Sequence, residues 1–150
     1  MRAVVDVNVI ISASLNRNGP PAKVIQAWLR GIFDVVVSPR LLEELERALK
    51  HRKLQKYIMI SEIAELIELF RLEGSLVEDP REPPSISPKD PGDEYIISLA
   101  FSTQSVIVSV DSHLLALSHD IPVYWPADFL EQLSTCFDSV NAPNTRNVSL

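Results

Sequence analysis

Two apolar segments of the sequence carry acidic residues where a fold alone would favour Val or Ile. Asp6 interrupts the β-branched run from Ala3 to Ile11, and Asp111 follows a similar run from Ser105 to Val110. Burying an unpaired carboxylate costs several kcal/mol as an order-of-magnitude estimate, so a buried acid is neutral, paired or placed against a cation. This pattern indicates a functional role for Asp6, with a structural Asp at a strand end as the alternative.

Further acidic residues lie at the margins of two expected helices. After Ser38-Pro39, an N-cap followed by a first helical proline, the apolar stripe is bordered by Glu44 on one edge and Glu46 on the other. Spacing leaves both glutamates open, and exposure to solvent is the alternative for each. Asp90 is expected to cap the next acidic helix, whereas Asp93 projects from the same side as that helix's apolar stripe.

Strand-like and helix-like segments alternate along the chain, which predicts an α/β fold with a parallel sheet. Strands are expected at residues 3–11, 33–37, 76–77, 105–110 and 121–124, and helices at 20–30, 39–49, 61–72, 91–100, 114–117 and 126–133. The carboxyl ends of parallel strands lie at one edge of the sheet. Asp6, Asp93, Asp111 and one of the two glutamates, Glu44 or Glu46, can therefore meet there. Clustered carboxylates stay ionised by sharing hard cations, which predicts a Mg²⁺ or Mn²⁺ site.

Bulk properties restrict the class of protein. The length of 150 residues and 46% hydrophobic content suit one domain, expected at residues 1–135, followed by a polar, flexible tail at 136–150. The single cysteine, Cys136, cannot form an internal disulfide, and no apolar stretch is long enough for a membrane span, so we expect a cytoplasmic protein.

A net charge of −6 argues against general binding of polyanions. One segment is nevertheless basic, and its cations include Arg47, Lys50, Arg52 and Lys53. It is a candidate contact for an anionic partner, with a solvated helix end as the alternative.

Four sequence blocks in a fixed order resemble a known family. They are VDVNVIISA at residues 5–13, SPRLLEEL at 38–45, DPGDEYIISLA at 90–100 and VSVDSHLL at 108–115. Together they resemble the PIN-domain ribonucleases, and in particular the VapC-like prokaryotic toxins of toxin-antitoxin systems. The resemblance implies a PIN-like three-layer α/β/α sandwich with a central, mainly parallel sheet.

The resemblance also assigns roles to individual residues. It places the family's catalytic, metal-binding acids on Asp6, Glu44, Asp93 and Asp111, and so selects Glu44 over Glu46. Three further polar residues are implied to support these ligands without replacing them: Asn8, Ser109 and Asp90. Val7 stands where the family usually has a hydroxyl residue, and Ser109 stands where it usually has Thr.

The function implied by the resemblance is hydrolysis of RNA phosphodiester bonds by an endoribonuclease with one or two Mg²⁺ or Mn²⁺ ions. A cognate antitoxin and a homodimer are implied as partners. We add the hypothesis that Arg47, Lys50, Arg52 and Lys53 attract the RNA, because a bare acidic rim repels phosphates.

Two functions other than a ribonuclease remain open from the sequence alone. The first is a non-catalytic PIN-fold module that binds RNA or protein. The second is a phosphatase like the haloacid dehalogenases, whose DxDx(T/V) loop resembles residues 6–9; here Asn8 stands in place of the required second Asp.

Overall fold

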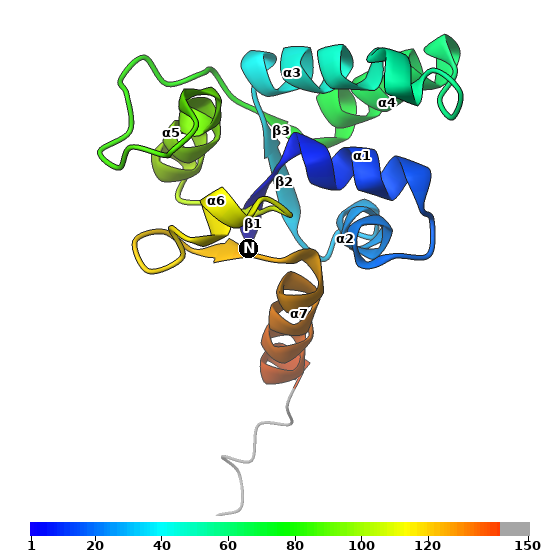
Figure 1. Ribbon diagram of the computed structural model, residues 1–150. Coiled ribbons are helices and arrows are strands. Elements are labelled where there is room, and N and C mark those ends of the chain that lie inside the picture. Colours follow the sequence, from blue (N-terminus) through cyan, green and yellow to red (C-terminus); the bar gives the residue numbers. More distant parts are fainter. Residues whose placement is uncertain (142–150) are drawn as a thin grey trace, which may run out of the picture.

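The computed structural model describes residues 1–141, and a five-stranded sheet lies at its centre (Figure 1). The strands stand in the order β3-β2-β1-β4-β5, and every neighbouring pair is parallel. Their bounds are β1 Arg2–Val5, β2 Asp34–Val37, β3 Ser75–Leu76, β4 Val106–Val108 and β5 Val123–Tyr124. The first strand is therefore the middle strand, and its carboxyl end lies at the centre of one sheet edge.

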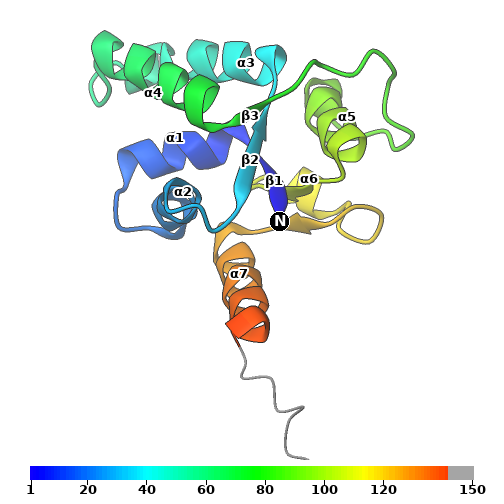
Figure 2. The same cartoon turned by 180° about the vertical axis from the view of Figure 1, so that it is seen from behind.

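Helices cover both faces of this sheet. Figures 1 and 2 show α1 and α2 on one side of it and α5 on the other. The α-helices are α1 Val7–Leu15, α2 Pro20–Leu29, α3 Pro39–Leu49, α4 Ile60–Glu73, α5 Glu94–Thr103, α6 Ser112–Leu115 and α7 Pro126–Asn141, and the short 3-10 helices are η1 Arg52–Leu54 and η2 Pro91–Asp93. The predicted α/β/α sandwich with a parallel sheet is confirmed.

The register of the strands explains why two distant acids lie close together. Val5 of β1 pairs with Val108 of β4, so the residues that follow each strand leave the sheet side by side. The Asp6 amide continues this ladder by donating to the Val108 carbonyl oxygen at 2.9 Å. The buried, β-branched residues of β1 and β4 thus fix the position of the acids at the sheet edge.

The expected strand at residues 3–11 is wrong beyond Val5. The chain turns at Asp6, which has extended backbone angles and is the N-cap residue of α1. Val9 and Ile10 are buried in that helix, while Asn8 is exposed. A short apolar run does not distinguish a buried strand from a buried helix by periodicity, and here the run contains one of each.

The end of the chain also differs from the prediction. Helix α7 runs to Asn141, so its last turns occupy the first part of the tail that we expected at 136–150. The rest of that expected tail, residues 142–150, lies outside the described residues. No helix in the described part of the chain combines the length and the apolar character that crossing a membrane requires.

Candidate active site

Two aspartates and one serine form the central part of the site at the ends of β1 and β4. Asp6 is only 5% exposed and Ser109 is fully buried. The Ser109 hydroxyl donates to Asp6 Oδ2 at 2.8 Å and accepts from the Asp111 amide at 3.0 Å. Ser109 therefore links the Asp6 side chain to the backbone that positions Asp111.

Asp111 occupies the turn into α6. Its Oδ1 accepts a hydrogen bond from the His113 amide at 2.9 Å, which makes Asp111 the N-cap of this short helix. The side chain is partly exposed, unlike that of Asp6. Asp111 thus has a capping role as well as a place in the acidic site.

Asp93 reaches the same site from the opposite side, where η2 meets α5. Asp90 caps η2 by accepting from the Gly92 amide at 2.9 Å, so the expected cap serves η2 and α5 begins later, at Glu94. The carboxylate of Asp93 makes no cap hydrogen bond, and its Oδ2 is buried without a hydrogen-bond partner among the described residues. A buried acceptor left unpaired is costly unless a cation or donor occupies the site.

The aspartates perturb one another's protonation. Burial, together with the nearby charges of Asp111, Asp6 and Asp90, raises the pKa of Asp93 to about 6. Burial also raises the pKa of Asp6, and Asp111 adds to this, while the Ser109 hydrogen bond acts in the opposite direction. Asp6, Asp93 and Asp111 are therefore close enough for their charges to repel one another.

Glu44 is held differently from the three aspartates. It lies on α3, one turn after Arg40, and its Oε1 is 3.5 Å from Arg40 Nε and 3.3 Å from Arg47 Nη1. The side chain is 25% exposed. Glu46, the other glutamate that spacing left open, pairs with Lys50 at 2.7 Å on the surface. Glu44 is thus the less exposed of the two glutamates, and its carboxylate forms ion pairs with both Arg40 and Arg47.

Sequence reasoning missed two residues beside the site, Arg40 and Tyr95. The guanidinium carbon of Arg40 lies 5.2 Å from the centre of the Tyr95 ring. Burial raises the pKa of Tyr95, and the charges of Asp6, Glu44 and Asp93 add to this effect. Tyr95 therefore lies between Glu44 and the aspartates. The tyrosine stands in the sequence two residues after Asp93, but nothing in its spacing indicated a place beside the acids.

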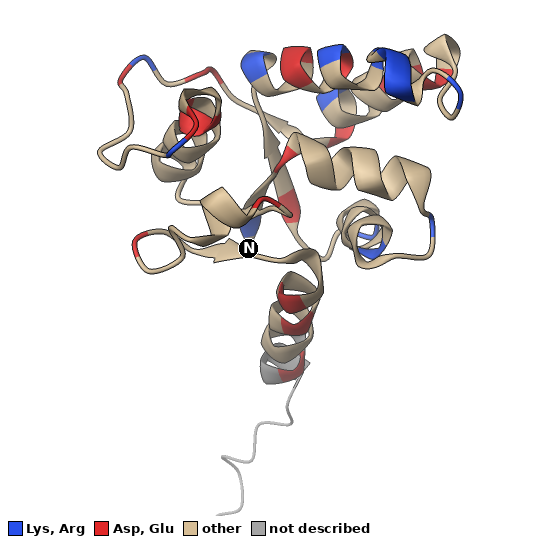
Figure 3. Ribbon diagram, viewed as in Figure 1, with Lys and Arg blue, Asp and Glu red and all other residues tan. Residues whose placement is uncertain are grey.

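The predicted basic segment lies along the far part of α3 and the turn that follows it (Figure 3). Arg47 and Lys50 are engaged in ion pairs with Glu44 and Glu46. Arg52 and Lys53 are exposed on η1, where Lys53 donates its amide to His51 Nδ1. At about 1.5 Å of rise per residue, Lys50 lies roughly 15 Å along the helix from Arg40. Arg40 is therefore nearer to the acidic site than Lys50 is.

The donor set fits a hard divalent cation. Asp6, Asp93 and Asp111 offer only oxygen ligands, repel one another and include the unpartnered Oδ2 of Asp93. Among the described residues, no three His, Cys, Asp or Glu side chains are close enough together to hold a metal ion as they stand. The three carboxylates therefore have to move closer together before they can share an ion.

Comparisons with known proteins agree with this architecture. The family model of the PIN domain matches residues 2–113. An uncharacterized protein of Methanocaldococcus jannaschii is 25% identical over 143 residues, which cover 88% of this chain and 91% of that relative. The family match covers all four predicted acids and excludes the haloacid-dehalogenase alternative as the family of this chain.

Two solved structures share the fold. VapBC-1 from nontypeable Haemophilus influenzae superimposes with a TM-score of 0.59 at 18% identity and covers 85% of this chain and 99% of its own. VapBC2 from Rickettsia felis, bound to a DNA fragment from its promoter, gives a TM-score of 0.56 at 12% identity, covering 83% and 98%. At these identities the likeness shows a common fold.

Proposed function

This chain belongs to the PIN domain family, whose members are generally nucleases, and we propose that it is a metal-dependent endoribonuclease acting on RNA phosphodiester bonds. The observation that carries the proposal is the convergence of Asp6, Asp93 and Asp111 from three distant parts of the chain. The raised pKa values of Asp6 and Asp93 support the proposal, because burial and neighbouring carboxylates both act on these acids.

In this proposal the residues of the chain have separate tasks. Asp6, Asp93 and Asp111 hold one or two Mg²⁺ or Mn²⁺ ions, with Glu44 as a further ligand once its arginines release it. Such ions activate water and stabilise the leaving oxygen of a phosphodiester. Ser109 keeps Asp6 oriented through its 2.8 Å hydrogen bond, and exposed Asn8 on the first turn of α1 is placed to contact the substrate.

We further propose that the protein is the toxin of a toxin-antitoxin pair and forms a homodimer. The support is the fold that the chain shares with the chains of two VapBC structures. Affinity purification of the tagged protein from its native cells, followed by mass spectrometry, tests the partner. Recovery of this chain alone would contradict it.

The decisive experiment incubates the purified protein with structured and unstructured RNAs in Mg²⁺, Mn²⁺ or EDTA. We expect cleavage with either metal and none in EDTA. Asp6→Asn and Asp93→Asn should each reduce cleavage by at least about 100-fold, because each variant removes a charged ligand from the shared site.

Asp128→Asn is the matched control, since Asp128 is an exposed acid on α7 away from the sheet edge. It should cleave at the wild-type rate. Equal cleavage by wild type and Asp6→Asn would exclude the proposed site, and cleavage that persists in EDTA would exclude the metal requirement.

A non-catalytic module that binds RNA or protein is the second candidate. The observation that favours it is the pairing of Glu44 with both Arg40 and Arg47, which engages that carboxylate in ion pairs and not with a metal ion. RNA binding with no cleavage in any metal, by protein shown to be folded, would favour this candidate over the nuclease.

A further inference from the structure

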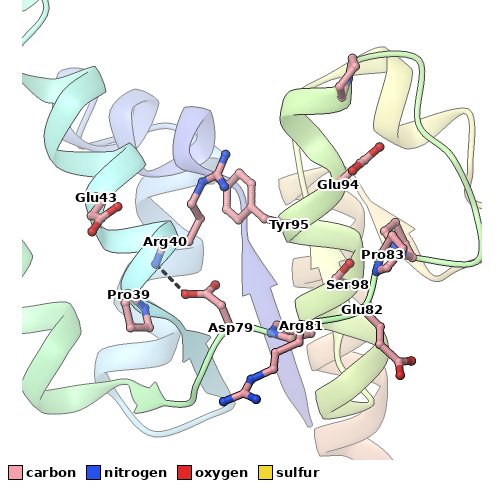
Figure 4. Close-up of a pocket in the computed structure, with 13 residues that line it drawn as sticks. Pro39, Arg40, Glu43, Asp79, Arg81, Glu82, Pro83, Glu94, Tyr95 and Ser98 are labelled. Carbon is pink, nitrogen blue, oxygen red and sulfur yellow. Dashed lines mark hydrogen bonds between the residues drawn. The ribbon is translucent and has the colours of Figure 1, made fainter.

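A pocket of about 550 Å³ opens between α3, α5 and the loop that precedes η2 (Figure 4). Its size is in the range of small-molecule sites and exceeds that needed for a single nucleobase. The charged and aromatic residues that line it include Arg40, Glu43, Asp79, Arg81, Glu94 and Tyr95. None of the four predicted acids lines this pocket, so it is separate from the metal site but adjacent to it.

Tyr95 connects the pocket with the acidic site. It lines the pocket, and the charges of Asp6, Glu44 and Asp93 all act on its hydroxyl. Asp93 is also only two residues before it on the chain. An RNA strand with one phosphate at the aspartates can therefore place a neighbouring nucleotide in the pocket.

Arg40 forms a flat platform at the pocket wall. Figure 4 shows it reaching from α3 toward the Tyr95 ring on α5, and its guanidinium carbon is 5.2 Å from the ring centre. Glu44 holds the same group at 3.5 Å, yet 52% of the Arg40 side chain is exposed. Unpaired RNA bases stack on guanidinium planes held in this way.

The remaining wall is rich in hydrogen-bond acceptors. Four carboxylates line the pocket, from Glu43, Asp79, Glu82 and Glu94, against two guanidinium groups. Asp79 accepts from the Arg40 amide through Oδ2 at 2.9 Å, and its buried Oδ1 has no partner among the described residues. Such a wall disfavours a phosphate and suits a ligand that donates hydrogen bonds, as exocyclic amino groups of bases do.

We propose that this pocket binds an unpaired base with an exocyclic amino group, next to the scissile phosphate. Cytosine, adenine and guanine each offer an exocyclic amino group to its acceptors, whereas uracil has none and offers only its N3–H between two carbonyl oxygens. The flat Arg40 guanidinium is the reason that a base is a better occupant than a basic side chain of a protein partner: a neutral ring can stack on it, whereas a cation stacked there meets a like charge. The proposal rests on the proposed function insofar as the base belongs to the RNA that is cleaved.

The test titrates ¹⁵N-labelled protein in EDTA with cytidine, adenosine or uridine and follows amide signals by NMR. These probes carry no phosphate, so their binding is independent of metal and of cleavage. We expect shifts at the amides of Asp79, Arg81, Glu82 and residues 94–98, and a preference for cytidine and adenosine over uridine of about 5–100-fold. Arg40→Lys keeps the positive charge but removes the planar guanidinium on which a base can stack. It should therefore weaken cytidine binding about 10-fold.

Arg47→Lys is the matched control, because Arg47 pairs with the same glutamate but lies about two turns farther along α3 than Arg40. It should leave the base preference unchanged. The double variant Glu43→Gln with Glu94→Gln changes two exposed side chains and should bind cytidine and uridine about equally.

Three results would overturn the proposal: equal binding of cytidine and uridine by wild type, equal effects of Arg40→Lys and Arg47→Lys, or tighter binding of an acetylated Gly-Arg-Gly amide peptide at the same amides. Nucleoside binding without any RNA cleavage would instead contradict the proposed function alone. If the protein does cleave RNA, sequencing of the cut sites should show the same base preference beside the cut. Arg40→Lys should lose this preference.

Discussion

Ser109 is a single hydroxyl that serves two aspartates at once. It donates to the buried Asp6 carboxylate and accepts from the Asp111 amide, so its removal leaves two polar groups without a partner. We expect Ser109→Ala to lower the free energy of unfolding by about 1–3 kcal/mol and to raise the pKa of Asp6 further. Urea denaturation followed by circular dichroism measures the first effect.

Ser109→Thr is the control, because it keeps the hydroxyl at a position where the family usually has Thr. It should retain most of the stability and bind Mg²⁺ as wild type does, whereas Ser109→Ala should bind Mg²⁺ about 10–100-fold more weakly. If Ser109→Ala and Ser109→Thr have equal Mg²⁺ affinities, the hydroxyl has no role in the site.

Asp93 predicts a pH dependence of stability for the metal-free protein. Its pKa rises from 3.8 to about 6 on folding, so the folded protein binds more protons than the unfolded chain in this window. The free energy of unfolding is therefore highest below about pH 4 for this group and falls as the pH rises through 6. After allowance for partial exposure, the change is about 1 kcal/mol.

Urea denaturation in EDTA at several pH values measures this effect. Asp93→Asn cannot titrate, so its stability should fall less than that of wild type between pH 4 and pH 7. The same slope in wild type and Asp93→Asn would show that another group causes the dependence. Mg²⁺ affinity should fall below about pH 6, because protons compete for the same carboxylate.

The acids were predictable from the sequence because a carboxylate inside an apolar run conflicts with the hydrophobic pattern. Arg40 and Tyr95 carried no such signal. Arginine in the first turn of an exposed helix and tyrosine beside an apolar stripe are both ordinary, and their contact joins segments 55 positions apart in sequence. Only the packing of α3 against α5 brings them together.

At the scale of elements, the junction between β1 and α1 is where the sequence was least informative. The residues on both sides of Asp6 are β-branched and apolar, and they are buried both in the strand and in the helix. Helices 20–30, 39–49 and 61–72 were predicted within about two residues, because each has a proline, a cap or a glycine at its ends. At this turn the N-cap is Asp6 itself, whose side chain makes no capping hydrogen bond, and no proline or glycine stands beside it.

Gly74 joins α4 to β3 where the backbone passes very close to its neighbours. A Cβ at this position would lie 2.5 Å from the Phe70 carbonyl oxygen and 3.2 Å from a Val37 methyl group. We expect Gly74→Ala to reduce the free energy of unfolding by about 1–3 kcal/mol, since backbone and core must move apart. Thermal and urea denaturation both report this loss.

Gly31 provides the comparison, because it needs glycine for a different reason. Its φ is +79° and nothing lies within 4 Å of an added Cβ. Asn tolerates this left-handed backbone, so Gly31→Asn should cost less than Gly74→Ala. The reverse order of stability would contradict the close approach at Gly74.

The basic segment remains a prediction for η1. Arg52 and Lys53 are exposed and form no ion pair among the described contacts, so they are free to meet RNA phosphates. Replacing both by Ala should weaken binding of single-stranded RNA and reduce the slope of log affinity against log salt by about 1.4. Fluorescence anisotropy in EDTA, between 50 and 200 mM salt as roughly the sensitive range, measures both quantities.

Lys23→Ala with Arg30→Ala makes the same change of charge on the exposed face of α2. This control should affect the salt slope less than the change on η1 does. If both pairs have the same effect, the attraction comes from overall charge and the basic segment is not a binding site.

At the scale of the whole molecule, the fold class was predictable and its sheet order was not. Alternating strands and helices required a parallel α/β sheet, but the order β3-β2-β1-β4-β5 depends on which apolar faces pack together. The same limit applies to the site. The sequence predicted that acids follow β1 and β4. Only the structure shows that these two strands are adjacent in the sheet.

An apolar surface on the turn into α4 leads to a prediction about assembly. Tyr57, Met59 and Ile60 are 69%, 66% and 78% exposed. Exposed apolar patches commonly mark protein interfaces, so we expect a homodimer that buries this one. Light scattering after size-exclusion chromatography should give twice the monomer mass for wild type and the monomer mass for Met59→Glu with Ile60→Glu. A wild-type monomer at all concentrations would contradict the dimer.

The central place of β1 has a consequence for synthesis of the chain. Asp6 leaves the ribosome early, but its partners Ser109 and Asp111 follow more than a hundred residues later. At about 5–20 residues per second, translation therefore takes about 5–20 s to bring them together. Until then β1 lacks its β4 neighbour and the acids stand apart, so a nascent chain cannot assemble the site before β4 and Asp111 have been synthesised.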